Sequence, residues 1–238
     1  MKYLKLLSRH EAATPLLALM FATGVGVALV AGRIALTHSM RYTLLVWNLF
    51  LAWLPLVFAL LACWALQRYP SRRWKFFTLA GAWLLFFPNA PYICTDLIHL
   101  PNSYYFKHYW IDLVLVLLCA LTGLVLGFVS LYLMQSVVAR RFGAAASWLF
   151  VAVTVTLGSF GIYLGRFLRL NSWDLFLRPD KVYQHLDRWP NSVWFSGHTV
   201  SFLGMFAIFL FLTYVMLFAL THLPKAELRD LPPADSKI

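Results

Sequence analysis

The chain has 238 residues, of which 61% are hydrophobic, 17% are aromatic and only 12% are charged. The charged share is about half that of an average soluble domain, so the composition excludes an ordinary soluble protein. A formal net charge of +11 would favour nucleic-acid binding in a soluble chain. Here the basic residues flank long apolar runs, and we therefore expect membrane lipids, and no nucleic acid, as partners.

Six stretches of the chain contain no Asp, Glu, Lys or Arg, and about 20 apolar residues suffice to cross the hydrocarbon core of a bilayer. The stretches are 12–32, 42–67, 76–95, 113–139, 142–165 and 199–224. We retain the first as a membrane helix because it is long for the apolar part of a signal peptide. The pattern predicts an all-α, polytopic integral membrane protein with about six transmembrane helices. It indicates a single integral membrane domain over 1–238, with a polar cytoplasmic tail at 225–238.

Lysine and arginine are distributed unevenly between the two sides of this topology. With the N-terminus inside, 12 of the 20 basic residues lie on the inner side. The positive-inside rule then favours a cytoplasmic location for both termini. Whatever the orientation, the loops after the first, third and fifth segments share one side if all six segments span. Asn48, near the start of the second segment, lies close to that side.

The third stretch contains the sequence FFPNAPYICTDLIHL, residues 86–100, which interrupts an apolar helical pattern. The twelve residues before its first proline reach only about 18 Å as a helix, whereas the hydrocarbon core is about 30 Å thick. Proline lacks an N–H and clashes with the preceding helical turn. We therefore predict that segment three is broken at Pro88-Asn89-Ala90-Pro91, inside the membrane and towards its outer side. Asn89 is the candidate cap of a restarted α-helix.

Polar residues follow this break and also follow the fifth segment. On a restarted helix, Tyr92, Asp96 and His99 fall at i, i+4 and i+7 and form one stripe. The sequence GIYLGRFLRLNSWDL, residues 161–175, brings a second cluster to the same side: Arg166, Arg169, Asn171, Trp173 and Asp174. A carboxylate near the bilayer is costly without a partner. We therefore expect Asp96 and His99 to form one group with Arg166 and Arg169.

Two interpretations of these residues remain open. Asp96 and His99 are candidate catalytic residues, because an imidazole titrates near neutrality and a carboxylate can orient it for proton transfer. Alternatively, they pair with the arginines and hold the loops together. The arginines either clamp a phosphate group or bind lipid headgroups at a helix end. The candidate substrate-binding residues are Asn89, Tyr92, Arg166, Arg169, Asn171, Trp173 and Asp174.

His108 and Asp112 add an imidazole and a carboxylate on the same side of the membrane. Together with Asp96 and His99 they form only a weak metal-binding pattern. We predict no metal site from it, and the sequence leaves any cofactor unknown.

Glycines recur at helical spacing in the fourth and fifth segments, as Gly123-x-x-x-Gly127 and Gly158-x-x-Gly161-x-x-x-Gly165. Small residues at such spacing let membrane helices approach closely. We therefore expect these two segments to pack tightly against neighbouring helices.

Three runs of the chain resemble a known family when they are taken together. They are RYTLLVWNLFLAWLPL, LFFPNAPYICTDLIHL and SFGIYLGRFLRLNSWDL. The chain resembles the bacterial membrane family DUF1361, a domain of unknown function, over roughly residues 40–220. The resemblance implies a multi-pass protein of the bacterial cytoplasmic (inner) membrane. It supplies no activity, substrate or catalytic residue.

Three functions remain as hypotheses. The first is a polar pocket at the extracytoplasmic side that binds or processes an anionic lipid-linked or phosphate-bearing substrate. The second is a small transporter that uses the broken third segment, as discontinuous helices do in other transporters. The third is a non-catalytic membrane assembly partner, with the polar motifs as structural locks. A transporter needs polar groups in both halves of the membrane, whereas a binding protein or an enzyme needs only one opening.

Overall fold

The computed structural model describes residues 10–40, 42–100, 109–170, 172, 174, 180 and 197–221, without the side chains of residues 10–13 and 99. Most of these residues are helical, with no strand among them. The elements in chain order are α2 (His10–Thr37), α3 (Thr43–Arg68), α4 (Arg73–Phe86), α5 (Asn89–Tyr92), the 3₁₀ helix η1 (Ile93–His99), α6 (Tyr109–Phe167) and α9 (Gly197–Thr221). The polar tail predicted at 225–238 lies outside the described residues.

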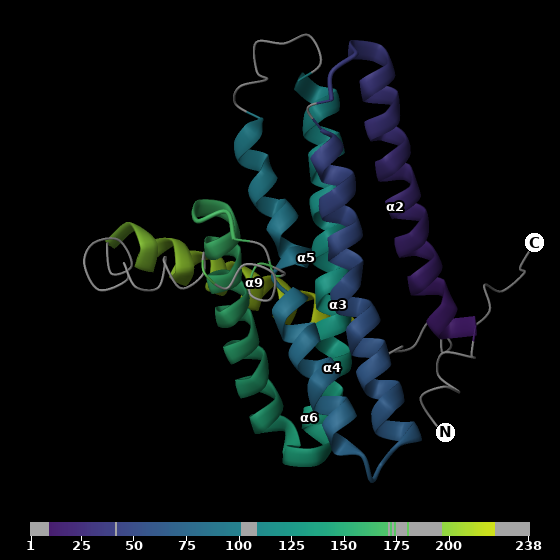
Figure 1. The fold of residues 1–238 in the computed structure, drawn as a ribbon, viewed down its shortest axis with the longest axis vertical. Helices are drawn as coiled ribbons and strands as arrows, with labels where there is room; N and C mark the ends of the chain where they lie inside the picture. The colour runs from purple at the N-terminus through teal and green to yellow at the C-terminus, as the bar shows by residue number, and fades with distance from the viewer. Residues whose placement is uncertain are drawn as a thin grey trace, which may run out of the picture.

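Five of the helical segments that the structure describes are long and apolar enough to cross a membrane, and one of these is the continuous stretch Arg73–Ile98. Helix α6 has 59 residues, or about 88 Å at 1.5 Å per residue, far more than one crossing needs. Its backbone leaves the helical region at Gly143, with φ 86° and ψ 174°, a conformation that suits glycine. The chain reverses there, so that residues 109–142 (the first arm) and 144–167 (the second arm) run side by side (Figure 1). The prediction of an all-α, polytopic membrane protein is confirmed, and the segments at 113–139 and 142–165 are the two arms of α6.

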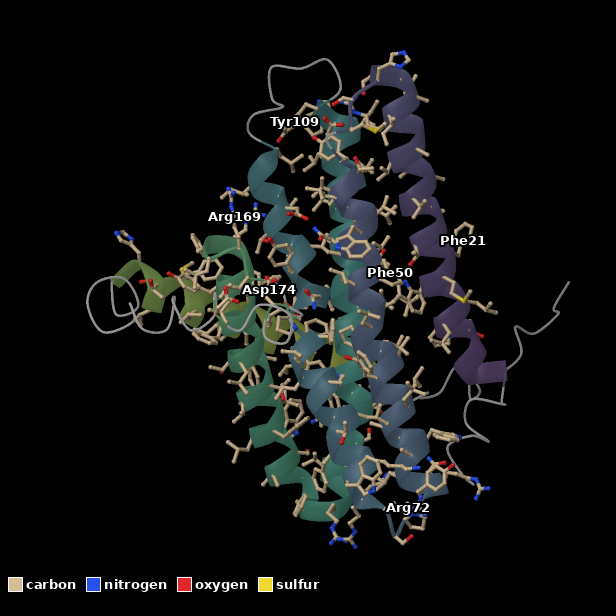
Figure 2. The ribbon with its side chains drawn as sticks, viewed as in Figure 1. Phe21, Phe50, Arg72, Tyr109, Arg169 and Asp174 are labelled. Carbon is tan, nitrogen blue, oxygen red and sulfur yellow. The ribbon has the colours of Figure 1, made fainter. Side chains whose placement is uncertain are left out.

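The ends of the helices are arranged as the predicted topology requires. The turn between α3 and α4 lies at the same end of the molecule as the turn at Gly143 (Figure 1). Arg72 marks this end, and Tyr109 lies near the opposite one (Figure 2). Ion pairs join Arg33 of α2 to Asp112 of α6, and Asp96 of η1 to Arg166 of α6. That the first, third and fifth loops share one side of a membrane stays a prediction.

At the prolines of segment three the backbone stays helical, but its hydrogen bonding changes from the α-type towards the tighter 3₁₀ type. Helix α4 ends at Phe86, and the backbone of Phe87 and Pro88 stays in the right-handed helical region. Because Pro91 has no N–H, the Phe87 carbonyl lacks its ordinary i+4 donor. The Ala90 N–H donates to that carbonyl instead, at 3.2 Å, which is a 3₁₀-type bond. An α-helix does restart at Asn89, as predicted, but it ends at Tyr92. The chain continues as the 3₁₀ helix η1, so the part that carries Asp96 and His99 is not α-helical as predicted.

Glycines on both arms of α6 hold this proline-containing segment between them. On the first arm, a Cβ at Gly123 would lie 2.7 Å from the Ala90 carbonyl oxygen. On the second arm, a Cβ at Gly158 would lie 2.9 Å from the Phe87 ring, and a Cβ at Gly161 would lie 2.4 Å from Pro88 Cγ. Only a hydrogen atom fits at these contacts. The close approach predicted from the glycine spacing is therefore confirmed.

Helix α9 packs on the outside of α6 and runs across the other helices in Figure 1. The hydroxyls of Tyr163 and Thr199 are hydrogen-bonded at 3.2 Å, and the Tyr214 hydroxyl donates to the Gln135 side chain. Past the Tyr214 bond the contact is aromatic, with Trp148 against Phe218 at 5.1 Å between ring centroids. These bonds orient α9, because hydrogen bonds between helices compensate for the weak hydrophobic driving force inside a bilayer.

The tightest of the glycine contacts provides the first test. Replacing Gly161 with Ala should force the second arm away from Pro88, and such overpacking typically costs about 1–3 kcal/mol. We expect Gly161→Ala to lower the midpoint of thermal unfolding of the purified protein in detergent.

The matched control is Gly204→Ala in α9, where a Cβ would meet nothing within 4 Å. This variant should unfold at the wild-type temperature or slightly above it, because alanine is favoured over glycine in a helix by about 1 kcal/mol. Equal midpoints for the two variants would show that the second arm is not packed tightly on Pro88.

Candidate functional site

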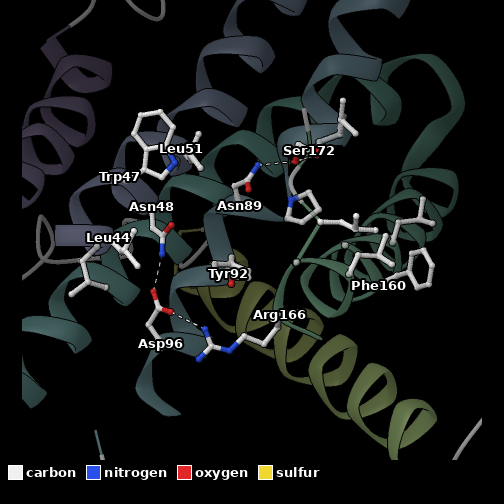
Figure 3. A pocket seen from close by; sticks show the side chains of 18 of the residues that line it. Leu44, Trp47, Asn48, Leu51, Asn89, Tyr92, Asp96, Phe160, Arg166 and Ser172 are labelled. Carbon is white, nitrogen blue, oxygen red and sulfur yellow. Dashed lines mark hydrogen bonds and ion pairs between the residues drawn. The ribbon is translucent and has the colours of Figure 1, made fainter. Parts of the chain in front are cut away.

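A cavity of about 860 Å³ lies between α3, α4 and the second arm of α6. Its walls are mostly apolar: Leu44, Leu45, Trp47 and Leu51 from α3, Leu84 and Leu85 from α4, and Leu157, Phe160 and Leu164 from α6. Figure 3 shows Trp47 and Leu51 on one side of the cavity and Phe160 on the other. The polar side chains that line it are Tyr42, Asn48, Asn89, Tyr92, Asp96, Arg166 and Ser172.

Asp96 joins three separate elements at one end of this cavity. Its Oδ1 lies 3.1 Å from Nη1 of Arg166 on the second arm of α6. Its Oδ2 accepts a hydrogen bond of 2.9 Å from the side-chain amide of Asn48 on α3. Figure 3 shows both bonds. The predicted pairing of Asp96 with Arg166 is therefore present in the structure.

Burial explains why this carboxylate has two partners. Asp96 is only 9% exposed, and an isolated charge at that depth would be strongly unfavourable. A guanidinium neutralises the charge and an amide N–H satisfies the second oxygen, which are the conditions under which a buried ion pair is tolerated. The sequence contains one signal for Asn48, since it is a rare polar residue in the apolar run of α3. It was not among the predicted site residues, because a single amide in a membrane helix does not reveal which neighbour it faces.

Asn89 and Ser172 connect the proline-containing segment to the chain that follows α6. The Asn89 amide donates to the Phe86 carbonyl and to the Ser172 hydroxyl, each at 3.1 Å. The Ser172 hydroxyl in turn donates to the Leu85 carbonyl at 3.0 Å. The prediction that Asn89 caps the next helix is wrong, because its side-chain amide donates to the Phe86 carbonyl of the preceding turn. Sequence analysis did not identify Ser172, although it lies inside the polar run 171–174.

Tyr92 lines the cavity, and its ring packs against Gly165, where a Cβ would lie 3.1 Å from Cε2. Arg169 is placed differently: it is exposed, with a left-handed φ of 53°. Within the part of the chain that the structure describes, the ion pairs do not include Arg169, so the structure does not bring it into the Asp96 group.

Asp174 is buried at 8% exposure but is not part of the cavity lining. The side chain of His99 and the whole of Asn171, Trp173 and His108 lie outside the described residues.

Asp112 belongs to a second ion pair, with Arg33 of α2. Arg33 Nε lies 2.5 Å from Oδ1 and Nη2 lies 3.1 Å from Oδ2, so the contact is bidentate. Asp112 is 1% exposed, and neither residue lines the 860 Å³ cavity. This pair joins α2 to the first arm of α6. Both carboxylate oxygens of Asp112 accept hydrogen bonds from the Arg33 guanidinium.

Long apolar helices, glycine-mediated packing and the buried carboxylates of two ion pairs define an α-helical, polytopic membrane protein. The chain belongs to a family whose model is described as protein of unknown function (DUF1361) and matches residues 47–218. The matched range includes Asn48, Asp96 and Arg166, so it covers the whole of this three-residue contact. No curated protein and no solved structure matches the chain.

The Asp96–Arg166 pair makes a prediction about stability. Asp96→Ala leaves the guanidinium without its partner and should destabilise the protein by about 3 kcal/mol, the usual scale for breaking a buried pair. Asp96→Asn should cost less, because its amide oxygen still accepts one hydrogen bond. The double variant Asp96→Ala with Arg166→Met should cost less than the sum of the two single changes, because it leaves no buried charge.

Unfolding free energies from a double-mutant cycle measure this coupling. Strictly additive losses would contradict the interpretation that the two side chains stabilise each other across the cavity.

Proposed function

We propose that this protein is a multi-pass protein of a bacterial cytoplasmic membrane, with both termini in the cytoplasm. In this proposal it binds an anionic, phosphate-bearing substrate, lipid-linked or free, in the cavity at its extracytoplasmic side. The observation that carries the proposal is the convergence of Arg166, Asp96 and Asn48 at one end of a largely apolar cavity. Membrane lipids surround the site and are its expected neighbours, and the identity of any protein partner is open.

The size and lining of the cavity support a binding function. Its volume of about 860 Å³ falls in the range of about 300–1,000 Å³ that is usual for small-molecule sites. Such sites combine apolar walls with a few placed polar groups, as this one does. Among the cavity-lining residues that the structure describes, Arg166 is the cation. Its planar guanidinium, with five N–H donors, suits phosphate oxygens better than a single ammonium does.

The charges at the two ends of the molecule support the orientation. The turn between α3 and α4 and the end of the first arm carry Arg68, Arg72, Arg73, Lys75, Arg140 and Arg141. The cavity lies towards the opposite end, beside the start of α3 and the end of α6. Because cytoplasmic loops are enriched in Lys and Arg, this charge asymmetry favours an extracytoplasmic position for the cavity.

The geometry of Asp96 favours a positioning role over proton transfer. Both of its oxygens accept hydrogen bonds, one from the Arg166 guanidinium and one from the Asn48 amide, so both are already engaged by neighbouring side chains. In this role Asp96 and Asn48 hold the Arg166 guanidinium at the cavity wall. A catalytic role for Asp96 with His99 remains the alternative within this proposal.

The extent of the cavity supports a binding site with one opening over a transport path. Its α3 wall ends at Leu51 and its α6 wall begins at Leu157, so this lining covers one half of the bundle. Alternating access would require a site reachable from both sides. A purely structural assembly partner would bind none of the probes used below.

Arg166 provides the direct test of the proposed function. We expect the purified wild-type protein to bind a phosphate-bearing probe, either inorganic phosphate or dodecyl phosphate, with native mass spectrometry counting the bound molecules. Loss of a charged hydrogen bond costs about 1.5–3 kcal/mol, so Arg166→Gln should weaken binding by about tenfold to a hundredfold.

The matched control is Arg33→Gln, which breaks the other ion pair without touching the cavity. It should bind the probe as the wild type does, provided that both variants elute as monodisperse species. Equal binding by the wild type and Arg166→Gln would contradict a phosphate site at this residue.

A further inference from the structure

We propose that the ligand of this cavity is a single amphiphile drawn from one leaflet of the membrane. Its chain lies against α4 between α3 and the second arm of α6, and its phosphate head lies at Arg166. This inference rests on the proposed function and decides between its two sources of phosphate, a lipid and a soluble anion.

The height of the cavity matches one leaflet. Its α3 wall runs from Tyr42 to Leu51 and its α6 wall from Leu157 to Arg166. Each wall is about 13 Å long at 1.5 Å per residue. Half of the hydrocarbon core, which is about 30 Å thick in total, is about 15 Å. The site therefore extends over the depth that one lipid chain occupies in one leaflet.

The side walls of the cavity continue onto the lipid-facing surface. Leu44 is 70% exposed, Trp47 is 50% exposed and Leu157 is 46% exposed, although all three line the cavity. In a membrane-spanning helix, side chains exposed at these positions face acyl chains. A lipid chain therefore reaches the cavity sideways, without leaving the hydrocarbon phase.

Gly81 of α4 is exposed and lies where the end of the cavity far from Asp96 opens onto the surface of the bundle. It lines the cavity, and a Cβ at this position would meet nothing within 4 Å. Unlike Gly158 and Gly161, which exclude a side chain because another helix is in the way, Gly81 leaves room that no residue described in the structure fills. That room is apolar, since Leu84 and Leu85 lie one turn further along the same helix.

The ion pair lies towards the other end of the same cavity. Arg166 stands at the outer end of the α6 wall and pairs with Asp96 of η1, whose second carboxylate oxygen accepts a hydrogen bond from Asn48 of α3. A molecule with an apolar chain and an anionic head is complementary to both ends at once. A free phosphate ion contacts only the Arg166 end. It leaves about 13 Å of apolar wall without contact to the ligand.

The experiment compares two probes by native mass spectrometry on four proteins: the wild type, Gly81→Leu, Gly24→Leu and Arg166→Gln. Dodecyl phosphate carries both head and chain, and inorganic phosphate carries the head alone. The wild type should bind dodecyl phosphate at least about a hundredfold more tightly than inorganic phosphate, because only the first buries a chain. Gly81→Leu fills the open end of the cavity and should weaken dodecyl phosphate binding by at least about tenfold.

The matched control is Gly24→Leu in α2, where an added Cβ also meets nothing within 4 Å and which does not line the cavity. It should bind dodecyl phosphate as the wild type does. Thermal unfolding midpoints of both leucine variants should equal that of the wild type or lie slightly above it, since the added Cβ meets nothing within 4 Å and leucine is favoured over glycine in a helix.

The outcomes separate this inference from the proposed function on which it rests. If both probes bind equally well and only Arg166→Gln weakens them, the ligand is a soluble anion and the lipid inference is overturned. Wild-type binding of dodecyl phosphate by Gly81→Leu also overturns it. If no binding depends on Arg166, the proposed function and this inference fail together.

Discussion

The packing of residues 87–92 between the two arms of α6 is the constraint on which the rest of the structure depends. Two prolines deprive this segment of ordinary helical hydrogen bonds, so it needs support from neighbouring helices inside the membrane. Gly123 admits the backbone of Ala90 on one side, and Gly161 admits the ring of Pro88 on the other. The reversal at Gly143 places both arms where this is possible. Because the segment is held so closely, η1 leaves it in a fixed direction and carries Asp96 to the end of α6.

Polar contacts then fix the positions of helices whose apolar surfaces are nearly interchangeable. In a bilayer, leucine gains little from facing a helix rather than a lipid, so hydrogen bonds and ion pairs decide much of the arrangement. Arg33 with Asp112 joins α2 to α6, and Trp83 donates to Ser130 and so joins α4 to the first arm. The Asp96 contact differs from these because it borders a cavity. Ion pairs and hydrogen bonds between helices therefore hold helices together in one place and line a candidate binding site in another.

Sequence reasoning reached part of this site for identifiable reasons. The pairing of Asp96 with Arg166 follows from topology alone, since both follow segments that end on the same side and a carboxylate there requires a cation. The second partner, Asn48, did not follow, because the rotation of α3 about its axis decides which neighbour the amide faces. Arg169 shows the converse: it is three residues from Arg166, yet a left-handed backbone angle at the end of α6 leaves it exposed. Asp112 was grouped with His108 by spacing, whereas its partner Arg33 comes from α2.

The sequence by itself determined the class of protein, the apolar segments, the position of the proline-induced irregularity and the side on which the polar residues gather. These properties depend on local composition and on the thickness of the bilayer, and both can be evaluated along the chain. Only the tertiary structure decided that the helix tightens at its prolines without opening, that Asn48 and Ser172 take part, and that a cavity of about 860 Å³ lies beside Arg166. A cavity is the space that several helices leave between them. Its existence depends on their mutual rotation and tilt, which apolar sequences surrounded by lipid specify only through contacts between residues far apart in the chain.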